Sequence, residues 1–217
     1  MTGERRIYLI RHGKADRKSD HRTETARGPA ADPPLDATGK EQVAALTRRL
    51  LKMPTPAAIY CSTLTRARQT IEPFVEATSA EVIHLQDLVE WHAGDWEFKE
   101  FEEFLAEDPE MPSRILMQDP LFHLAPGSEA FEEFRARVVD TVEGALIEHP
   151  EGDLWFVCHG GVINAYVGWV LGIEEQDMFI LPAHTSINTI RVVGNRRLLW
   201  FLSDDAHVTE PELFPEP

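Results

Sequence analysis

Residues 5–15 read RRIYLIRHGKA, and this stretch decides the fold. The apolar run Ile7–Ile10 stops abruptly at Arg-His-Gly, which is typical of a buried strand followed by a turn. Open α/β sheets bind ligands at the carboxyl ends of their strands, so we expect Arg11 and His12 at a binding edge. A histidine there can attack an electrophile, and the guanidinium fork of an arginine matches the oxygens of a phosphoryl group.

A second apolar run ends in the same way. Residues 154–163 read LWFVCHGGVI, which predicts a strand that delivers His159 to the same edge of the sheet and a helix that follows it. Gly160 and Gly161 allow a close approach of backbone to a ligand. The free N–H groups at the start of the helix favour an anion.

Two further segments bring charged side chains toward this edge. Residues 59–70, IYCSTLTRARQT, predict a strand followed by a helix that Ser62 or Thr63 caps, with Arg66 in its first turn. Residues 88–97, LVEWHAGDWE, place the carboxyl group of Glu90 among aromatic side chains. Desolvation there favours the protonated form that a general acid needs.

Together these segments resemble the histidine phosphatase superfamily, also called the phosphoglycerate mutase-like superfamily. The matching pieces follow the family order up to about Val193, and they are Arg11-His12-Gly13, the run 34–42, Ser62-x-Leu64-x-Arg66-Ala67-x-Gln69-Thr70, Leu88-x-Glu90-x-x-x-Gly94-x-Trp96-Glu97 and His159-Gly160-Gly161. Glu129 and the run 134–138 also resemble the start of a family helix that opens with Gly-Glu-Ser.

The resemblance implies a role for each residue. His12 would be the nucleophile that becomes phosphohistidine, and Glu90 would protonate the leaving group and then activate water. The phosphoryl group would be bound by Arg11, Arg66 and His159, with His159 counted among the catalytic residues. Gly160 and Lys18 complete the expected substrate-binding set. Glu97 is the rival general acid, and His184 is a further histidine that could line the site.

Departures from the family pattern favour one branch of its chemistry. The pattern of phosphoglycerate mutases resembles Arg-His-Gly-x-Ser-x-x-Asn, and this chain has Ala15 and Lys18 at the Ser and Asn positions. Phe98 replaces the glycine that follows Trp-Glu in many phosphatase members. We therefore expect a phosphomonoester hydrolase of the histidine acid phosphatase type that needs no metal or cofactor. The alternatives are a phosphoglycerate mutase-type phosphotransferase and a catalytically weak phosphate-binding or scaffolding member.

Composition limits the partners. The chain has 217 residues and a formal net charge of −16, which argues against nucleic acid as a ligand. A basic cluster on this acidic chain would attract a small phosphomonoester, and phosphate or sulfate could occupy its site. That cluster comprises Arg11, Lys14, Arg17, Lys18, Arg22 and Arg66. We expect no targeting or membrane segment and a cytoplasmic protein, and the oligomeric state is left open.

Competing phosphatase chemistries fit the sequence less well. Cys61 and Cys158 suggest neither a zinc pattern nor a disulfide framework. The spacing from Cys61 to Arg66 is too short for the phosphate loop of a cysteine phosphatase. No carboxylate and histidine cluster suits metal-dependent hydrolysis.

The order of the elements predicts a three-layer α/β sandwich with a mainly parallel sheet, an antiparallel edge strand and a single domain over 1–217. Strands are expected at 6–10, 57–61, 81–85 and 154–158, with a hairpin formed by 185–193 and 197–202. The region 14–34 reads as a long loop, 91–126 as a small helical cap insertion with a helix over 98–105, and 203–217 as a loose acidic tail.

Overall fold

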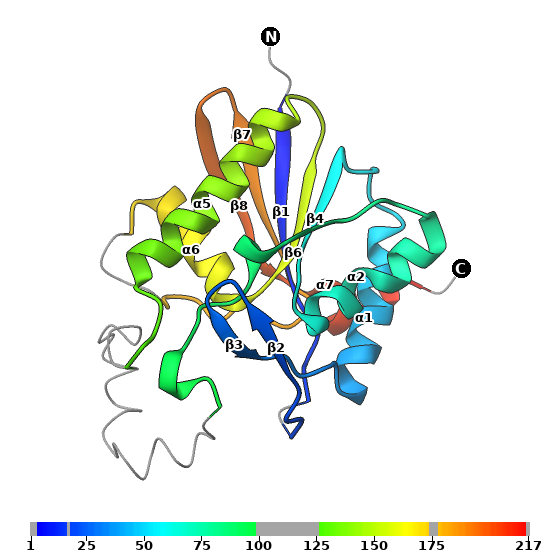
Figure 1. Ribbon diagram of the computed structural model, residues 1–217. Coiled ribbons are helices and arrows are strands. Elements are labelled where there is room, and N and C mark those ends of the chain that lie inside the picture. The colour runs from blue at the N-terminus through cyan, green and yellow to red at the C-terminus, as the bar shows by residue number, and fades with distance from the viewer. Residues whose placement is uncertain (1–3, 17, 99–125, 174–177, 216–217) are drawn as a thin grey trace.

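The central sheet has six strands in the order β5-β4-β6-β1-β7-β8 in the computed structural model, which describes residues 4–16, 18–98, 126–173 and 178–215. Strands β5 (Ile83–Leu85), β4 (Ala58–Ser62), β6 (Leu154–Cys158) and β1 (Arg5–Arg11) run parallel. Strands β7 (Ile187–Val193) and β8 (Arg196–Asp204) form an antiparallel pair, and β7 joins β1 in antiparallel fashion. The predicted mainly parallel sheet is confirmed (Figure 1).

Helices cover both faces of the sheet (Figure 1). Helices α1 (Ala37–Leu50) and α2 (Thr65–Thr78) lie on one side, and α5 (Phe131–Glu148) and α6 (Gly160–Leu171) lie on the other. Strand β1 shows why its sequence is apolar without interruption. Ile7 and Leu9 pack in the core under α5 and α6, whereas Tyr8 and Ile10 pack in the core under α1 and α2. A strand covered on both faces reads as a continuous hydrophobic run.

The strand register brings the catalytic segments to one edge of the sheet. Arg11 at the end of β1 lies opposite Cys158 at the end of β6, and Cys61 of β4 lies opposite Val157. His12 and His159, which follow β1 and β6, therefore leave the sheet side by side, and Ser62 is the last residue of the neighbouring strand β4. The expectation that both histidines share one edge is confirmed.

The region 14–34 is more ordered than the sequence predicts. It contains a two-stranded antiparallel hairpin, β2 (Arg22–Thr25) and β3 (Gly28–Ala31), which lies across the carboxyl end of the main sheet (Figure 1). Gly28 takes φ +111° at the turn, a conformation suited to glycine. The two short strands lack the hydrophobic alternation of a half-buried strand, so sequence periodicity could not reveal them.

The start of α2 also differs from the prediction. Its N-cap position is Leu64, which supplies no side-chain cap, so neither Ser62 nor Thr63 has the expected role. The carboxylate of Asp32, which follows the hairpin, instead accepts hydrogen bonds from the Thr65 backbone N–H (2.6 Å) and the Thr65 hydroxyl (2.7 Å).

The prediction of a loose tail is wrong for residues 203–215, the part of the tail that the structure describes. Strand β8 continues to Asp204, and α7 (Ala206–Thr209) and the short 3-10 helix η4 (Pro211–Leu213) follow it. The His207 side chain is fully buried, and Arg49 of α1 forms an ion pair with Asp204. This contact between distant segments orders a terminus whose composition reads as a solvated tail.

The expected cap insertion lies mostly outside the described residues. Two single-turn 3-10 helices, η1 (Gln86–Leu88) and η2 (Gly94–Trp96), lead into it, but the helix expected over 98–105 falls in the range 99–125. Among the helices that the structure describes, none has both the length and the apolar character needed to cross a membrane.

Candidate active site

His12 lies at the carboxyl end of β1 and is 7 % exposed. Its Nδ1 lies 2.7 Å from the carbonyl oxygen of Gly13. A carbonyl oxygen can only accept, so Nδ1 carries the proton and Nε2 keeps its lone pair. Burial is the largest influence on the pKa of His12 and lowers it well below the ordinary value, and the positive charge of Arg66 adds to the shift. The imidazole is therefore neutral and nucleophilic at neutral pH.

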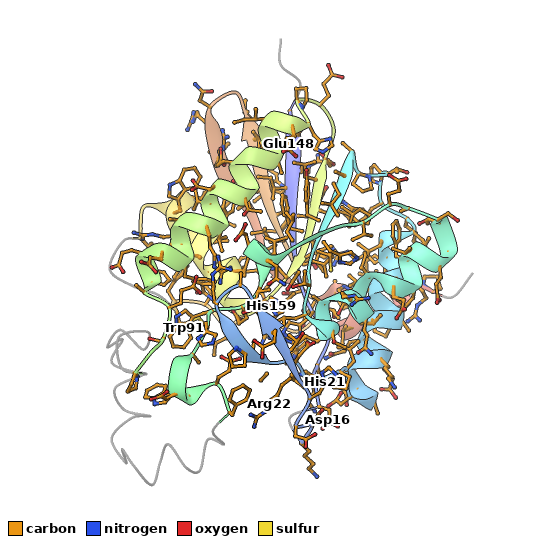
Figure 2. The ribbon with its side chains drawn as sticks, in the orientation of Figure 1. Asp16, His21, Arg22, Trp91, Glu148 and His159 are labelled. Atoms are coloured by element: carbon orange, nitrogen blue, oxygen red, sulfur yellow. The ribbon has the colours of Figure 1, made fainter. Side chains whose placement is uncertain are left out.

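His159 lies beside His12, with 5.1 Å between the ring centroids. Its Nε2 lies 2.8 Å from the hydroxyl oxygen of Ser62, whereas its buried Nδ1 has no hydrogen-bond partner among the described residues. Burial and then the charge of Arg66 lower the pKa of His159 well below the ordinary value. Figure 2 shows His159 at the hairpin end of the sheet, opposite the end at which Glu148 closes α5.

Two arginines accompany the histidines. Arg66 is 9 % exposed in the first turn of α2, and its Nη1 donates to the carbonyl oxygen of Ala31 at 3.1 Å. Burial lowers the pKa of Arg66, while the carboxylates of Glu90 and Asp32 oppose that shift. Arg11 donates through Nη1 to the carbonyl oxygen of Pro182 and lowers the pKa of both histidines by its charge. The site thus combines neutral imidazoles with cationic guanidinium groups.

Glu90 lies against the N-terminus of α6. Its Oε2 accepts from the backbone N–H of Gly161 at 3.0 Å, and its Oε1 accepts from the N–H of Trp91 at 3.0 Å. A Cβ atom on Gly161 would lie 2.3 Å from Oε1 of Glu90, so the second glycine of His-Gly-Gly makes room for this carboxylate. At Gly160 a Cβ atom would meet the Arg11 Nε at an ordinary 3.6 Å.

Glu97, the rival acid, has a different environment. Its Oε1 accepts from the backbone N–H of Ala31 at 2.8 Å, and its Oε2 accepts from that of Ala93 at 3.0 Å. One oxygen thus contacts the hairpin and the other contacts the segment after Glu90, so the Glu97 carboxylate links the two. The two glutamates line one small cavity together with Arg66, Trp91 and His92.

Several members of the expected basic cluster have described contacts away from the two histidines. Lys14 pairs with Asp36 at 3.3 Å, and the guanidinium of Arg22 lies 3.8 Å from the ring centre of Phe98. Lys18 lies in an exposed turn where its backbone N–H donates to Asp16, and no contact described for it joins it to the histidines. Arg17 lies outside the described residues.

Other residues complete the site. The ring centroid of His184 lies 5.8 Å from that of His12, so this histidine lies beside the nucleophile. Ser62 contacts His159, a role that its strand-end position did not indicate because a serine there is equally suited to capping. The cysteines are free and buried, and burial raises the pKa of Cys61 to about 12, which makes it a poor nucleophile.

Comparison with known proteins identifies the family of the chain. A family model described as histidine phosphatase superfamily (branch 1) matches residues 7–205. The metal-independent phosphoserine phosphatase of Arabidopsis thaliana is 26 % identical over 204 residues, which cover 94 % of this chain and 83 % of that protein. The adenosylcobalamin/alpha-ribazole phosphatase of Escherichia coli is 26 % identical over 203 residues, covering 89 % and 97 %.

The fold also matches that of solved structures. Bacillus stearothermophilus YhfR superposes with a TM-score of 0.78 at 26 % identity, and the match covers 93 % of this chain and 98 % of that one. The chain therefore belongs to the histidine phosphatase superfamily (branch 1) and is an enzyme of the phosphatase or phosphoglycerate mutase-like type.

Proposed function

We propose that the protein hydrolyses phosphomonoesters through a phosphohistidine intermediate on His12 and without a metal ion. The observation that carries the proposal is the hydrogen bond from His12 Nδ1 to the Gly13 carbonyl oxygen. It leaves Nε2 as the free nucleophilic nitrogen of a buried ring whose pKa is lowered.

In the first step Nε2 of His12 attacks phosphorus, and the bond from phosphorus to the ester oxygen breaks. Glu90 in its acid form donates a proton to that oxygen, so the alcohol leaves neutral. In the second step the Glu90 carboxylate takes a proton from water, and the oxygen of that water attacks phosphorus. The N–P bond then breaks, which releases phosphate and restores neutral His12.

Phosphoryl transfer depends on positioning and on neutralising the charge of the equatorial oxygens. Arg66 and Arg11 provide fixed positive charge for this purpose. The unpartnered Nδ1 of His159 can donate to a phosphoryl oxygen if Nε2 accepts the Ser62 hydroxyl proton. These residues account for the charge of a phosphoryl group, and we infer that the substrate is a small-molecule phosphomonoester.

A phosphoenzyme trap tests the proposal. A phosphomonoester labelled in its phosphoryl group is mixed with the enzyme and quenched within one turnover. We expect label on the chain that is stable to alkali and labile to acid, and free phosphate as the product. Label on another residue type, or turnover without labelled chain, would overturn the intermediate, and transfer to another position of the substrate would indicate a mutase.

The matched variant is His12→Ala. It removes the attacking nitrogen, so we expect no labelled chain and a fall in kcat on the order of a thousandfold or more. A melting temperature close to that of the wild type will show that the fold persists. Near wild-type turnover in a folded His12→Ala protein would refute the assignment.

A further inference from the structure

The guanidinium group of Arg137, on α5, is fully engaged around the segment that leads to Glu90. Its Nε and Nη2 donate to the two carboxylate oxygens of Glu129 at 2.6 and 2.8 Å. Its Nη1 donates to the backbone carbonyl oxygens of Asp87 and Val89 at 2.7 and 2.8 Å, and Nη2 also reaches that of Glu90 at 3.3 Å. The five N–H groups of the arginine thus have five acceptors.

Glu129 holds the chain on the other side of Glu90. Its backbone carbonyl oxygen accepts from the indole Nε1 of Trp91 at 2.7 Å, and its backbone N–H donates to the carbonyl oxygen of His92 at 2.9 Å. A carboxylate oxygen also accepts from the His92 N–H at 3.4 Å. Arg137 and Glu129 therefore fix the backbone immediately before and after Glu90.

Both side chains are buried, and neither lines the cavity beside Glu90. The Glu129 and Arg137 side chains are 6 % and 8 % exposed. A buried ion pair is costly to desolvate and is weak evidence for a stabilising role. Its geometry here, with three donor contacts to the carbonyl oxygens of residues 87–90 and two to the Glu129 carboxylate, points to positioning.

We propose that Arg137 and Glu129 are positioning residues for the general acid, which they orient by fixing the backbone on both sides of Glu90. The inference rests on the proposed function in one respect, the role of Glu90 as proton donor. Glu90 has a single N–H at each carboxylate oxygen, from Trp91 and Gly161. A shift of residues 87–92 would therefore move the carboxyl group relative to the leaving oxygen, and small misplacements of a catalytic group are costly in rate.

Glu129 also contacts the turn of the β2–β3 hairpin. Arg27, at the turn between β2 and β3, donates through Nε to Glu129 at 2.9 Å and through Nη2 to Asp87 at 3.0 Å. The adjacent strand β3 ends at Ala31, whose carbonyl oxygen accepts from Arg66. Glu129 thus connects the acid segment to the part of the hairpin that contacts a phosphate-binding arginine.

The test exploits the dependence of a general acid on the leaving group. An alkoxide needs a proton as its bond breaks, whereas a nitrophenolate leaves almost unaided. We would measure kcat and KM for p-nitrophenyl phosphate and for glycerol 2-phosphate in the variants Arg137→Lys, Glu129→Gln and Glu90→Gln. The control is Arg197→Lys, which alters the ion pair with Glu143 on the same helix, remote from His12.

We expect Arg137→Lys and Glu129→Gln to lower kcat/KM for the alkyl ester about tenfold or more, while kcat/KM for the aryl ester stays within about threefold, because kcat/KM reports only the first step, in which Glu90 donates its proton. Arg197→Lys should leave the ratio of the two rates unchanged. In the double variant Arg137→Lys/Glu90→Gln, the ratio should equal that of Glu90→Gln alone, because one residue acts through the other. A purely structural role would lower both rates together and add to the Glu90→Gln effect.

The outcomes separate the two proposals. If Glu90→Gln loses the alkyl activity selectively but neither positioning variant does so, the positioning role is overturned and the general acid stands. If Glu90→Gln retains full alkyl activity, the general acid is wrongly assigned and the positioning role fails with it. Should Arg137→Lys fail to fold, as judged by circular dichroism, Glu129→Gln decides the question because it keeps the arginine and the side-chain volume.

Discussion

The two histidines of the site use opposite ring nitrogens in their hydrogen bonds. His12 has its Nδ1 on the Gly13 carbonyl oxygen, whereas His159 has its Nε2 on the Ser62 hydroxyl. A carbonyl fixes its partner as a donor, but a hydroxyl can accept or donate. The first contact thus reserves Nε2 of His12 for attack, and the second allows Nδ1 of His159 to carry a proton toward an anion.

Gly161→Ala should act as an indirect mutation of Glu90. The added methyl group would fall 2.3 Å from Glu90 Oε1, the far end of a side chain that can move aside. We therefore expect alkyl phosphate turnover to fall about tenfold or more. For the aryl ester kcat/KM, which reports only the first step, should change little; the added Cβ would also lie 3.3 Å from Cζ of the buried Phe134, so the melting temperature is followed as well. Steady-state kinetics on both esters, with a thermal melt, provide the measurement.

Gly144→Ala is the matched control, because a Cβ atom at that position of α5 meets nothing within 4 Å. Alanine forms helix better than glycine by up to about 1 kcal/mol, so this variant should be as stable as the wild type or more stable. Its ratio of aryl to alkyl rates should not change. Unaltered alkyl kinetics in Gly161→Ala would contradict the role of Gly161 as the space for Glu90.

At the scale of elements, the β2–β3 hairpin and helix α2 depend on each other. Asp32, 3 % exposed, follows the hairpin and caps α2 through Thr65. Its neighbour Ala31 receives the hydrogen bond of Arg66 and also donates to Glu97. A helix whose cap comes from a distant loop has its first turn, and hence Arg66, positioned by that loop.

Asp32→Ala should therefore affect both stability and catalysis. Loss of an N-cap costs about 0.5–2 kcal/mol, and the free energy of unfolding measured in urea should fall by that amount. Because Arg66 binds the phosphoryl group of any substrate, kcat/KM should fall several-fold for aryl and alkyl esters alike. Asp36→Ala removes the cap that accepts from Gly39 N at the start of α1 and should reduce stability without this loss. Equal kinetics in the two variants would argue against coupling of the hairpin to Arg66.

At the scale of the whole molecule, three buried histidines make stability sensitive to acid. The pKa values of His12 and His159 are lowered mainly by burial, and burial also lowers the pKa of His207 to about 4. In the unfolded chain these rings bind protons near pH 6.5. Below that pH the unfolded state binds more protons than the folded state, so stability declines as the pH falls.

We expect the free energy of unfolding to decrease continuously between about pH 6.5 and 4, at up to about 1.4 kcal/mol per pH unit for each histidine that stays neutral in the fold. Urea titrations at several pH values measure the slope. His207→Gln should reduce it, because glutamine at the contact with Thr185 does not titrate. A slope of zero across this window would show that the rings are protonated within the folded protein. The low pKa of His12 also predicts that the nucleophile stays active at mildly acidic pH.

The sequence by itself predicted the mainly parallel sheet and the edge at which its strands end. It also predicted the four side chains at that edge, which are Arg11, His12, Arg66 and His159. The runs ending in Arg11-His12-Gly13 and His159-Gly160-Gly161 are local patterns, and burial of both sheet faces forces such strands to be apolar throughout. Because parallel strands end at one edge, the motifs had to converge. The strand-to-helix transitions in residues 59–70 and 154–163 likewise predicted α2 and α6; α2 buries one face, whereas α6 is buried without interruption from Gly160 to Gly168.

Tertiary structure alone decided how those groups are held. The cap from Asp32, the hydroxyl of Ser62 on His159 and the five acceptors around Arg137 join residues far apart in the chain. The different surroundings of Glu90 and Glu97 also arise in this way, because one carboxylate meets the start of α6 and the other meets the hairpin. Such contacts leave no periodic trace in the sequence. They arise from packing, because a polar group that becomes buried is mostly found with a hydrogen-bond partner, and that partner can come from any part of the chain.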